Sequence, residues 1–527
     1  MASPMVAVED AEDMFRPLVL DTVGRLYLHR YWDYEVRLSQ RLRELNTPIA
    51  LTDVQKAREL LDRLFPNPER LDPDWQKVAA AIALTRRLCV ISGGPGTGKT
   101  TTVVKVLAVL LTLDPTLRIA LAAPTGKAAA RLQESIRRQA ASLPVSPEII
   151  ARMPQEPHTL HRLLRYQPGR VGFRHNRDNP LPYDVVIVDE ASMLDLAMAA
   201  KLSDAVMDGA RLILLGDKDQ LASVETGSVF ADICRNRSIT PTGAELTKTL
   251  TGFDIPSGGR DGSDGGGLSD AIVLLNRSYR FSTEGGIGKL AQQINKGDGA
   301  AALDTLRIVD GPEVSWVNEA PETEALADRL FEGYATFVDA VKSASSPEKV
   351  LKAFEAYRAL CAVKESAQGT RRINEAIERR MRATLDDSGN AGRWFHGRPV
   401  IVTANDYLLK LYNGDIGVAL MDAAGELTTY FPNPDGSVRA VAPGRLTSCE
   451  TAFAMTVHKS QGSEFDSVDV VLTSAENRVL TRELLYTAIT RARTRIRVWG
   501  RSDVVKVTIS RRTERLSGLA DRILQSL

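Results

Sequence analysis

The stretch GGPGTGKT, residues 93–100, decides the fold of the first half of the chain. It follows the apolar run Leu88–Ser92 (LCVIS) and leads into the helical stretch Thr102–Leu113. This strand–loop–helix context is the one that the pattern G-x-x-x-x-G-K-[ST] requires. Glycines let backbone N–H groups turn toward phosphate oxygens, and the following helix adds its positive N-terminal end. The stretch therefore predicts a nucleotide-phosphate site.

Each residue type in the loop has an expected task. Lys99 should reach the β- and γ-phosphates, and Thr100 should ligate Mg²⁺. Gln76, seventeen residues before the loop, could read the edge of an adenine base, although a surface glutamine is the alternative. We expect ATP to contact the following loop residues: Gly93, Gly94, Pro95, Gly96, Thr97, Gly98, Lys99, Thr100 and Thr101.

Further short apolar runs alternate with helical stretches. Arg118–Ala123, Val185–Val188 and Arg211–Leu215 each end in polar or glycine-rich residues. Strands that alternate with helices indicate an α/β fold with a parallel sheet and crossover connections. In such sheets ligands bind beyond the carboxyl ends of the strands, where these polar residues fall.

Two of these strand ends carry candidate catalytic groups. Asp189 could hold Mg²⁺, and Glu190 could orient and deprotonate the attacking water. Gln220 in GDKDQL (216–221) could sense the γ-phosphate, and a simple turn between strand and helix is an equal alternative.

Composition excludes several classes of protein without choosing a partner. The 527 residues are 43% hydrophobic and 25% charged, which is typical of globular proteins. No run of eighteen apolar residues predicts a membrane span, and the N-terminus lacks the apolar core of a secretory signal, so we expect a cytoplasmic protein with no membrane partner. The four cysteines lack metal-ligand spacing. The 67 basic and 66 acidic residues nearly balance, so the net charge neither supports nor excludes binding to nucleic acid.

Changes in pattern along the chain suggest six segments. The first is helical, the fourth and sixth resume an α/β pattern, and the fifth is rich in short β-like runs. We expect a helical docking domain at 1–72, a first α/β domain at 73–251, a glycine-rich linker at 252–270, a second α/β domain at 271–391 and 451–527, and a β-barrel inserted at 392–450.

Eight motifs in fixed order resemble those of superfamily 1 helicases. They are GGPGTGKT, APTGKAAARL (123–132), TLHRLL (159–164), VIVDEASM (186–193), GDKDQL, RSYRF (277–281), TVHKSQGSEF (456–465) and ELLYTAITRAR (483–493). Within this superfamily the chain is similar to the RecD family, the α subunits of exodeoxyribonuclease V (RecBCD enzyme). RLYLHRYW (25–32), FRHNRDNPLP (173–182) and NGDIG (413–417) support that similarity. The resemblance covers nearly the whole chain.

The resemblance implies a two-domain ATP site. Two RecA-like domains would close on ATP, the barrel being SH3-like. Lys99, Asp189, Glu190 and Gln220 would act from the first domain. Arg280 and Arg491 would reach the γ-phosphate from the second, and Glu464 would lie near the ribose. A surface salt bridge is the alternative for either arginine.

It also implies a DNA track across both domains, with a hairpin at about 167–182 that splits the duplex. A basic surface loop is the alternative for this hairpin. Side chains that suit phosphates without reading bases are typical of such a track. The candidates are Thr125, Lys127, His158, Thr159, His161, Thr456, His458 and Lys459.

The predicted function is an ATP-dependent, 5′→3′ DNA helicase that serves double-strand-break repair and recombination beside RecB-like and RecC-like subunits. The nuclease would lie in a partner, because no acidic cluster with nuclease spacing stands out. The short segment before the phosphate loop favours the partner-bound type. A stand-alone superfamily 1 helicase, a nucleotide switch without motor activity and an inactive DNA-binding scaffold are the alternatives.

Overall fold

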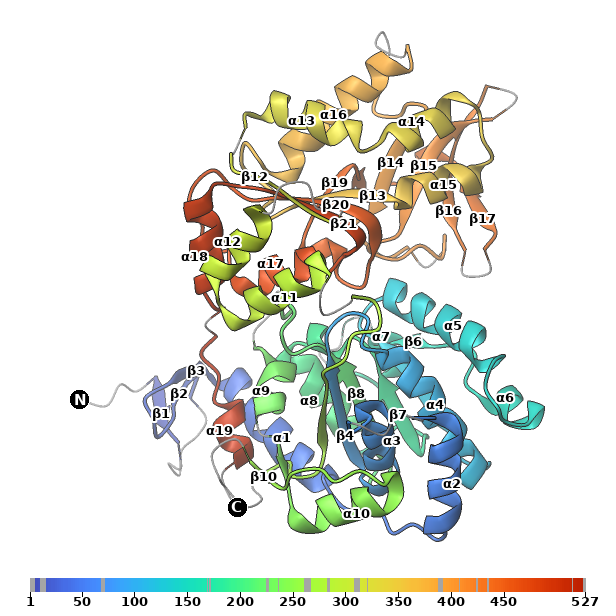
Figure 1. Ribbon diagram of the computed structural model, residues 1–527, viewed down its shortest axis with the longest axis vertical. Coiled ribbons are helices and arrows are strands. Elements are labelled where there is room, and N and C mark those ends of the chain that lie inside the picture. The colour runs from blue at the N-terminus through green and yellow to red at the C-terminus, as the bar shows by residue number, and fades with distance from the viewer. Residues whose placement is uncertain are drawn as a thin grey trace.

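The computed structural model describes residues 5–524 apart from 10–15, 68–71, 168, 170–171, 224–226, 236, 260–266, 282–284, 308–312, 320, 387–391, 407, 423–424, 434–435 and 514. Figure 1 shows two bodies, one above the other, with most of the first half of the chain in the lower body. Most of the second half forms the upper body.

A six-stranded parallel sheet organises the first half, in the order β11-β4-β8-β7-β5-β6. Its strands are β4 (Leu88–Gly93), β5 (Ile119–Ala123), β6 (His158–Thr159), β7 (Val185–Val188), β8 (Arg211–Gly216) and β11 (Ile272–Leu275). The helices around it are α3 (Trp75–Thr85), α4 (Lys99–Leu113), α5 (Gly126–Ala140), α6 (Pro147–Arg152), α7 (Leu160–Leu163), α8 (Leu196–Ala205), α9 (Val229–Arg235) and α10 (Pro241–Thr251).

Both faces of this sheet are covered, which explains its unbroken apolar runs. Successive strand residues point to opposite faces. Cys89 and Ile91 therefore enter the core beneath α3 and α4, whereas Leu88 and Val90 enter the core beneath α8 and α9. The sheet thus holds the carboxyl end of β4, and with it the phosphate loop, in a fixed place.

The N-terminal region is not the separate helical domain that the sequence suggested. It begins with a three-stranded sheet of β1 (Val6–Val8), β2 (Leu18–Leu20) and β3 (Leu26–Leu28). Next come α1 (His29–Leu45), which packs on α8, and α2 (Val54–Leu64), which packs on α4 and α10. The apolar faces of both helices, Leu38 and Leu61 among them, enter the cores of the first sheet. Burial of those faces joins this region to the first body.

The boundary expected at residue 271 is also wrong. β11 pairs with β4 in the first sheet although it lies within the segment assigned to the second domain. The described part of the glycine-rich segment is tied down as well, since β10 (Gly258–Gly259) pairs with β9 (Ser238–Ile239) and Asp270 forms an ion pair with Arg86. The remainder, 260–266, lies outside the described residues. The chain therefore crosses to the second body only after β11.

A five-stranded parallel sheet organises the second half, in the order β12-β21-β20-β13-β19. Its strands are β12 (Val314–Val317), β13 (Tyr357–Cys361), β19 (Ala454–Thr456), β20 (Phe465–Val471) and β21 (Ala492–Trp499). The helices of this half are α11 (Gly286–Lys296), α12 (Gly299–Arg307), α13 (Thr323–Glu332), α14 (Ala335–Lys342), α15 (Pro347–Glu355), α16 (Thr370–Thr384), α17 (Arg482–Ile489) and α18 (Ser502–Ser510). The expected α/β fold with two parallel sheets is confirmed.

The insert is an antiparallel sheet in the order β17-β16-β15-β14-β18. It comprises β14 (Arg398–Val402), β15 (Ile416–Met421), β16 (Leu427–Pro432), β17 (Val438–Val441) and β18 (Cys449–Thr451). Its own small core includes Val400, Leu411 and Phe431. Among the described residues β17 and β18 are edges that do not pair with each other, so strand pairing does not close this sheet into a barrel.

The C-terminus returns to the first half, contrary to the expected assignment of 451–527. α19 (Leu519–Leu524) packs on α1 and α9, with Leu519 and Ile523 in the core there (Figure 1). The Glu35 carboxylate accepts hydrogen bonds from the Ser517 hydroxyl and the Gly518 N–H, both at 3.0 Å. Two chain crossings therefore join the bodies. Across the described residues, no helix combines the length and apolar character that a membrane span needs.

Candidate nucleotide and DNA sites

The phosphate loop has the backbone that its sequence predicts. Gly96 and Gly98 have φ values of 75° and 79°, in the left-handed region where only glycine is free of strain. A Cβ at Gly98 would collide with the Gln76 amide, and one at Gly96 would collide with the Cβ of Arg280. Side chains at these two glycine positions would fill the loop, so the glycines leave it open as a cradle for a ligand. The loop lies at the start of α4, a helix long enough to present a positive end.

Two expected nucleotide contacts lie in this cradle. The Lys99 ammonium donates to the carbonyl oxygens of Gly93 at 2.6 Å and Gly94 at 3.3 Å. Gln76 is buried and its amide donates to the Thr97 carbonyl at 2.9 Å. Thr100 and Thr101 are half-buried in the first turn of α4. The described hydrogen bonds of this ammonium go to neutral carbonyl oxygens, which phosphate oxygens could replace.

The carboxylate pair follows β7 as expected. The Asp189 carboxylate accepts from the Glu190 N–H at 2.8 Å, and Glu190 has a φ of 53°. Burial and the Glu190 charge raise the pKa of Asp189, which the Lys99 cation partly offsets. A half-buried carboxylate beside a second one fits a site for a divalent cation such as Mg²⁺, which favours oxygen ligands.

Gln220 lies in the loop after β8, bonded to a residue that the sequence did not single out. Its amide donates to Asp217 at 2.9 Å, and the Tyr486 hydroxyl from α17 donates to the same oxygen at 3.1 Å. All three side chains are buried. Nothing local in the sequence predicts the pair of Asp217 and Tyr486, because their contact spans 269 residues.

Arg280 lies against the phosphate loop at Gly96. Its Nη2 donates to Glu464 at 2.7 Å, while its Nη1 is buried without a hydrogen-bond partner among the described residues. The neighbouring Tyr279 N–H donates to the Gly96 carbonyl at 2.7 Å. The Tyr279 ring is 61% exposed beside this loop, where it could stack on a base; the sequence reasoning missed it.

Glu464 lies among arginines in this structure. Arg280 and Arg493 form ion pairs with it at 2.7 and 3.4 Å. Burial raises the pKa of Glu464, but the charges of Arg280, Arg131 and Arg491 together bring it below its usual range. Glu464 is an anion that holds cations at the cleft.

Arg491 follows α17 and is almost fully buried. Its Nε donates to the Thr487 carbonyl at 3.1 Å and its Nη1 to the Ser463 carbonyl at 3.2 Å. Neither bond involves a carboxylate, so the surface salt bridge, the alternative for Arg491, is wrong. The two hydrogen bonds fix the direction of the guanidinium, whose planar fork suits phosphate oxygens.

The DNA candidates of the first half lie at one edge of its sheet. β6, with His158 and Thr159, pairs with β5, after which Thr125 caps α5 by accepting from the Ala128 N–H at 3.2 Å. Lys127 follows in the first turn of α5. Burial and the charges of Arg131 and Arg358 lower the pKa of Lys127 to about 7, against opposing pulls from Glu355 and Asp415.

His161 belongs to an aromatic cluster instead of standing alone. Its ring makes edge contacts with Tyr166 and Phe173, with centroids 6.2 and 5.6 Å away. Tyr166 and Phe173 also form the one antiparallel bridge in the described part of the expected hairpin. Residues 168 and 170–171 of that hairpin lie outside the described residues.

The candidates of the second half follow β19, the edge strand of its sheet. The Thr456 hydroxyl accepts from the Lys459 N–H at 3.3 Å, and the Lys459 ammonium pairs with Glu450 at 3.1 Å. His458 is half-buried, and burial together with the Arg515 charge lowers its pKa. The two sets of candidates thus lie at corresponding edges of the two parallel sheets.

The insert meets the first body at the candidate DNA turn. A Cβ at Gly126 would lie 2.8 Å from the ring of Tyr412, in the loop between β14 and β15. The Tyr412 N–H donates to Asp415 at 2.8 Å, which fixes this part of the loop. An aromatic side chain therefore covers the N-terminal end of α5.

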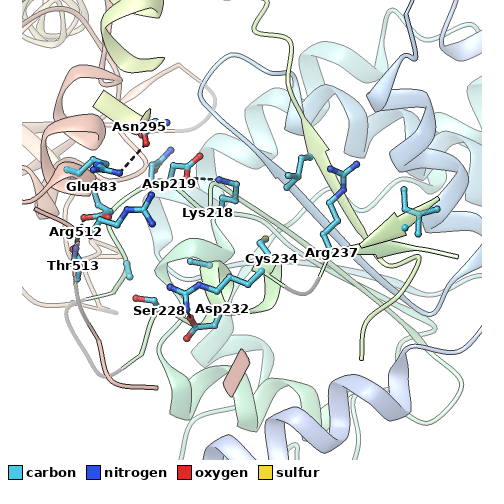
Figure 2. Close-up of a pocket in the computed structure, with 18 of the residues that line it drawn as sticks. Lys218, Asp219, Ser228, Asp232, Cys234, Arg237, Asn295, Glu483, Arg512 and Thr513 are labelled. Carbon is cyan, nitrogen blue, oxygen red and sulfur yellow. Dashed lines mark hydrogen bonds and ion pairs between the residues drawn. The ribbon is translucent and has the colours of Figure 1, made fainter. Parts of the chain in front are cut away.

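A cavity of about 670 Å³ lies between the two bodies, on another flank of the loop after β8. Figure 2 shows Lys218 and Asp219 of that loop facing Asn295, Glu483 and Arg512 of the second half. The loop is therefore packed on the side of Tyr486 and open on the side of this cavity.

Comparisons with known proteins show what this chain is similar to. Residues 76–226 match a family model described as an AAA domain, and residues 451–499 match a UvrD-like helicase C-terminal domain. The RecBCD enzyme subunit RecD of Mycobacterium tuberculosis is 42% identical over 94% of this chain and 80% of its own length. The ATP-dependent RecD2 DNA helicase of Deinococcus radiodurans is 29% identical over 95% of this chain and 59% of its own length. A solved Pif1 helicase from Bacteroides, in complex with ADP-AlF3 and single-stranded DNA, is 17% identical with a TM-score of 0.40, over 85% of this chain and 92% of that one.

Proposed function

The chain belongs to the RecD family of RecBCD enzyme subunits, and from this premise we propose that it moves 5′→3′ along single-stranded DNA, fuelled by ATP and Mg²⁺. It is an ATP-hydrolysing DNA helicase of a RecBCD-type complex, a machine of double-strand-break repair and recombination. In this proposal its partners are RecB-like and RecC-like subunits, one of which carries the nuclease. The proposed location is the cytoplasm.

One observation carries the motor assignment: a helix of the second body, α17, lies beside the phosphate loop of the first. Lys99 lies in the loop, the Tyr486 hydroxyl of α17 lies 2.8 Å from the place of a Cβ at Gly94, and Arg280 pairs with Glu464 of the second half. Hydrolysis that requires groups from two bodies depends on how they are placed relative to each other. Such an arrangement can convert the nucleotide state into movement.

The residues divide the proposed chemistry among them. The phosphate loop and Lys99 would hold the β- and γ-phosphates, with Gln76 and Tyr279 at the base. Thr100 and Asp189 would hold Mg²⁺, which supplies charge neutralisation on the phosphate oxygens. Glu190 would take the proton of the attacking water, and Gln220 would orient that water or sense the γ-phosphate. The orphan Nη1 of Arg280 suits an anion at this place.

The DNA track of the proposal runs along the matching edges of the two sheets. Thr125, Lys127, His158, Thr159 and His161 would hold the strand in one half, and Thr456, His458 and Lys459 in the other. Contacts to phosphate give no base preference, which suits a translocating motor. The segment at about 167–182 would split the duplex beside the aromatic side chains at the start of this segment. The insert, an SH3-like module in this proposal, would close over the strand.

A second candidate, a stand-alone helicase, draws on the similarity to RecD2. The 42% identity to a RecBCD subunit against 29% to RecD2 favours the subunit. The N-terminal region would then dock a partner. Co-purification with RecB-like and RecC-like chains from the same genome separates these candidates, since a stand-alone helicase would unwind DNA fully without them.

The first experiment measures ATP hydrolysis with and without single-stranded DNA, beside Lys99→Gln. We expect strong stimulation by DNA that disappears in the variant, because the variant lacks the cation that holds the phosphates. Unwinding of duplexes with a 5′ or a 3′ overhang then tests polarity. If DNA does not change the rate of ATP hydrolysis, either for the chain alone or for the chain with its partner subunits, a nucleotide switch is favoured.

A further inference from the structure

The loop Asp217–Leu221 is joined to the second half by three hydrogen bonds. The Tyr486 hydroxyl donates to Asp217 at 3.1 Å, and the Leu221 N–H donates to the Thr487 hydroxyl at 2.8 Å. The Gln461 amide donates to the Leu221 carbonyl at 2.5 Å. These bonds make the loop a direct contact between the two bodies, so its position depends on how they lie relative to each other.

Tyr486 lies where three functional elements meet. Its hydroxyl shares one Asp217 oxygen with the Gln220 amide and lies 2.8 Å from the place of a Cβ at Gly94 in the phosphate loop. The side chain is 4% exposed. Burial and the Asp217 charge raise the pKa of Tyr486 well above 10, so the hydroxyl stays a donor at neutral pH. A change in the phosphate loop, at Gln220 or in α17 therefore alters the hydrogen bonds that this Asp217 oxygen accepts.

The helix of Tyr486 also sets the position of Arg491. The carbonyl of Thr487, the next residue of α17, accepts the hydrogen bond from Nε of Arg491 at 3.1 Å. A rotation or shift of α17 at Tyr486 therefore moves this guanidinium. The cavity beside Lys218 and Asp219 leaves the loop room to shift when Gln220 changes its partner (Figure 2).

We propose that Tyr486 is a positioning residue that couples the nucleotide state sensed by Gln220 to α17 and Arg491, and so to the affinity for DNA. When Gln220 turns to a γ-phosphate, Asp217 retains the Tyr486 hydroxyl as its side-chain donor. The stronger bond draws α17 and Arg491 toward the phosphate. This inference rests on the proposed helicase function and adds the residue that links its two halves.

Tyr486→Phe removes only the hydroxyl and tests the proposal. We expect kcat of DNA-stimulated hydrolysis to fall about tenfold, the size of one hydrogen bond to a charged group, with KM for ATP and affinity for a fluorescent ADP within twofold of wild type. The decisive readout is the ratio of DNA Kd values with and without a non-hydrolysable ATP analogue. Coupling between two sites appears in this ratio, which should approach one in the variant.

Tyr334→Phe is the matched control. Tyr334 is fully buried and its hydroxyl donates to the Phe453 carbonyl in the second core, away from the cleft. It should lower stability and leave the ratio of DNA affinities unchanged. Asp217→Asn, alone and combined with Tyr486→Phe, completes a cycle in which the double variant should lose little more than either single one.

The outcomes separate the inference from the function on which it rests. If wild type shows no DNA-stimulated hydrolysis, the helicase proposal fails first. If wild type is stimulated and Tyr486→Phe keeps both the wild-type kcat and the wild-type ratio of DNA affinities, the coupling role is overturned. Additive effects of Asp217→Asn and Tyr486→Phe would also overturn it, because they would show that the two groups act independently.

Discussion

The nucleotide cleft and the candidate DNA track are built in different ways. In the cleft, contacts cross between the two halves: the Tyr486 hydroxyl donates to Asp217, which also accepts from Gln220. Along the track, the hydroxyls of Thr125, Thr159 and Thr456 each accept a hydrogen bond from the backbone N–H three residues further along the chain. Chemistry needs fixed geometry, whereas movement along any DNA sequence needs phosphate contacts that can be made and released.

The sharpest test of this contrast is Arg491→Lys. Lysine keeps the charge but lacks the fork that reaches both the Thr487 and Ser463 carbonyls. We expect kcat for DNA-stimulated hydrolysis to fall about 10³-fold, the lower end of what a trans-acting arginine contributes. DNA affinity without nucleotide, measured by fluorescence anisotropy, should stay within twofold. A loss of less than fivefold in kcat would remove Arg491 from the cleft's chemistry.

Glu190→Gln should have the next largest effect. The amide cannot accept a proton from water, so kcat should fall about 10²-fold, whereas ATP binding should hold or tighten. Single-turnover hydrolysis measures the chemical step directly. Glu148→Gln, a change at an exposed helix start far from the cleft, serves as control. Equal effects of the two substitutions would argue against a general base at Glu190.

Changes along the DNA track should have smaller effects, and the affinity for DNA should depend on pH. Because the pKa of Lys127 is lowered to about 7, this ammonium is charged below pH 7 and loses its charge above it. DNA phosphates favour the charged form, so binding takes up a proton and the Kd for single-stranded DNA should weaken as pH rises from 7 to 8, by at most about tenfold. Lys127→Arg stays charged and should abolish this dependence. A flat profile for wild type would place Lys127 off the DNA.

Most of the local chemistry could be predicted. The phosphate loop, the carboxylates after β7 and the glutamine after β8 follow apolar runs whose ends mark the ligand edge of a parallel sheet. Periodicity could not assign β11, because a buried strand of four residues looks the same in either sheet. The N-terminal helices misled for a similar reason, since their apolar faces identify burial and not the surface that covers them.

By itself, the sequence determined the phosphate loop, the order of the motifs and the two parallel sheets, because glycine spacing and apolar runs act over a few residues. Only the tertiary structure decided which strands share a sheet, that α19 closes back on α1, and that Tyr486 and Asp217 meet. Those contacts join residues hundreds of positions apart, and their partners are selected by the packing of complementary buried surfaces, which no local pattern records.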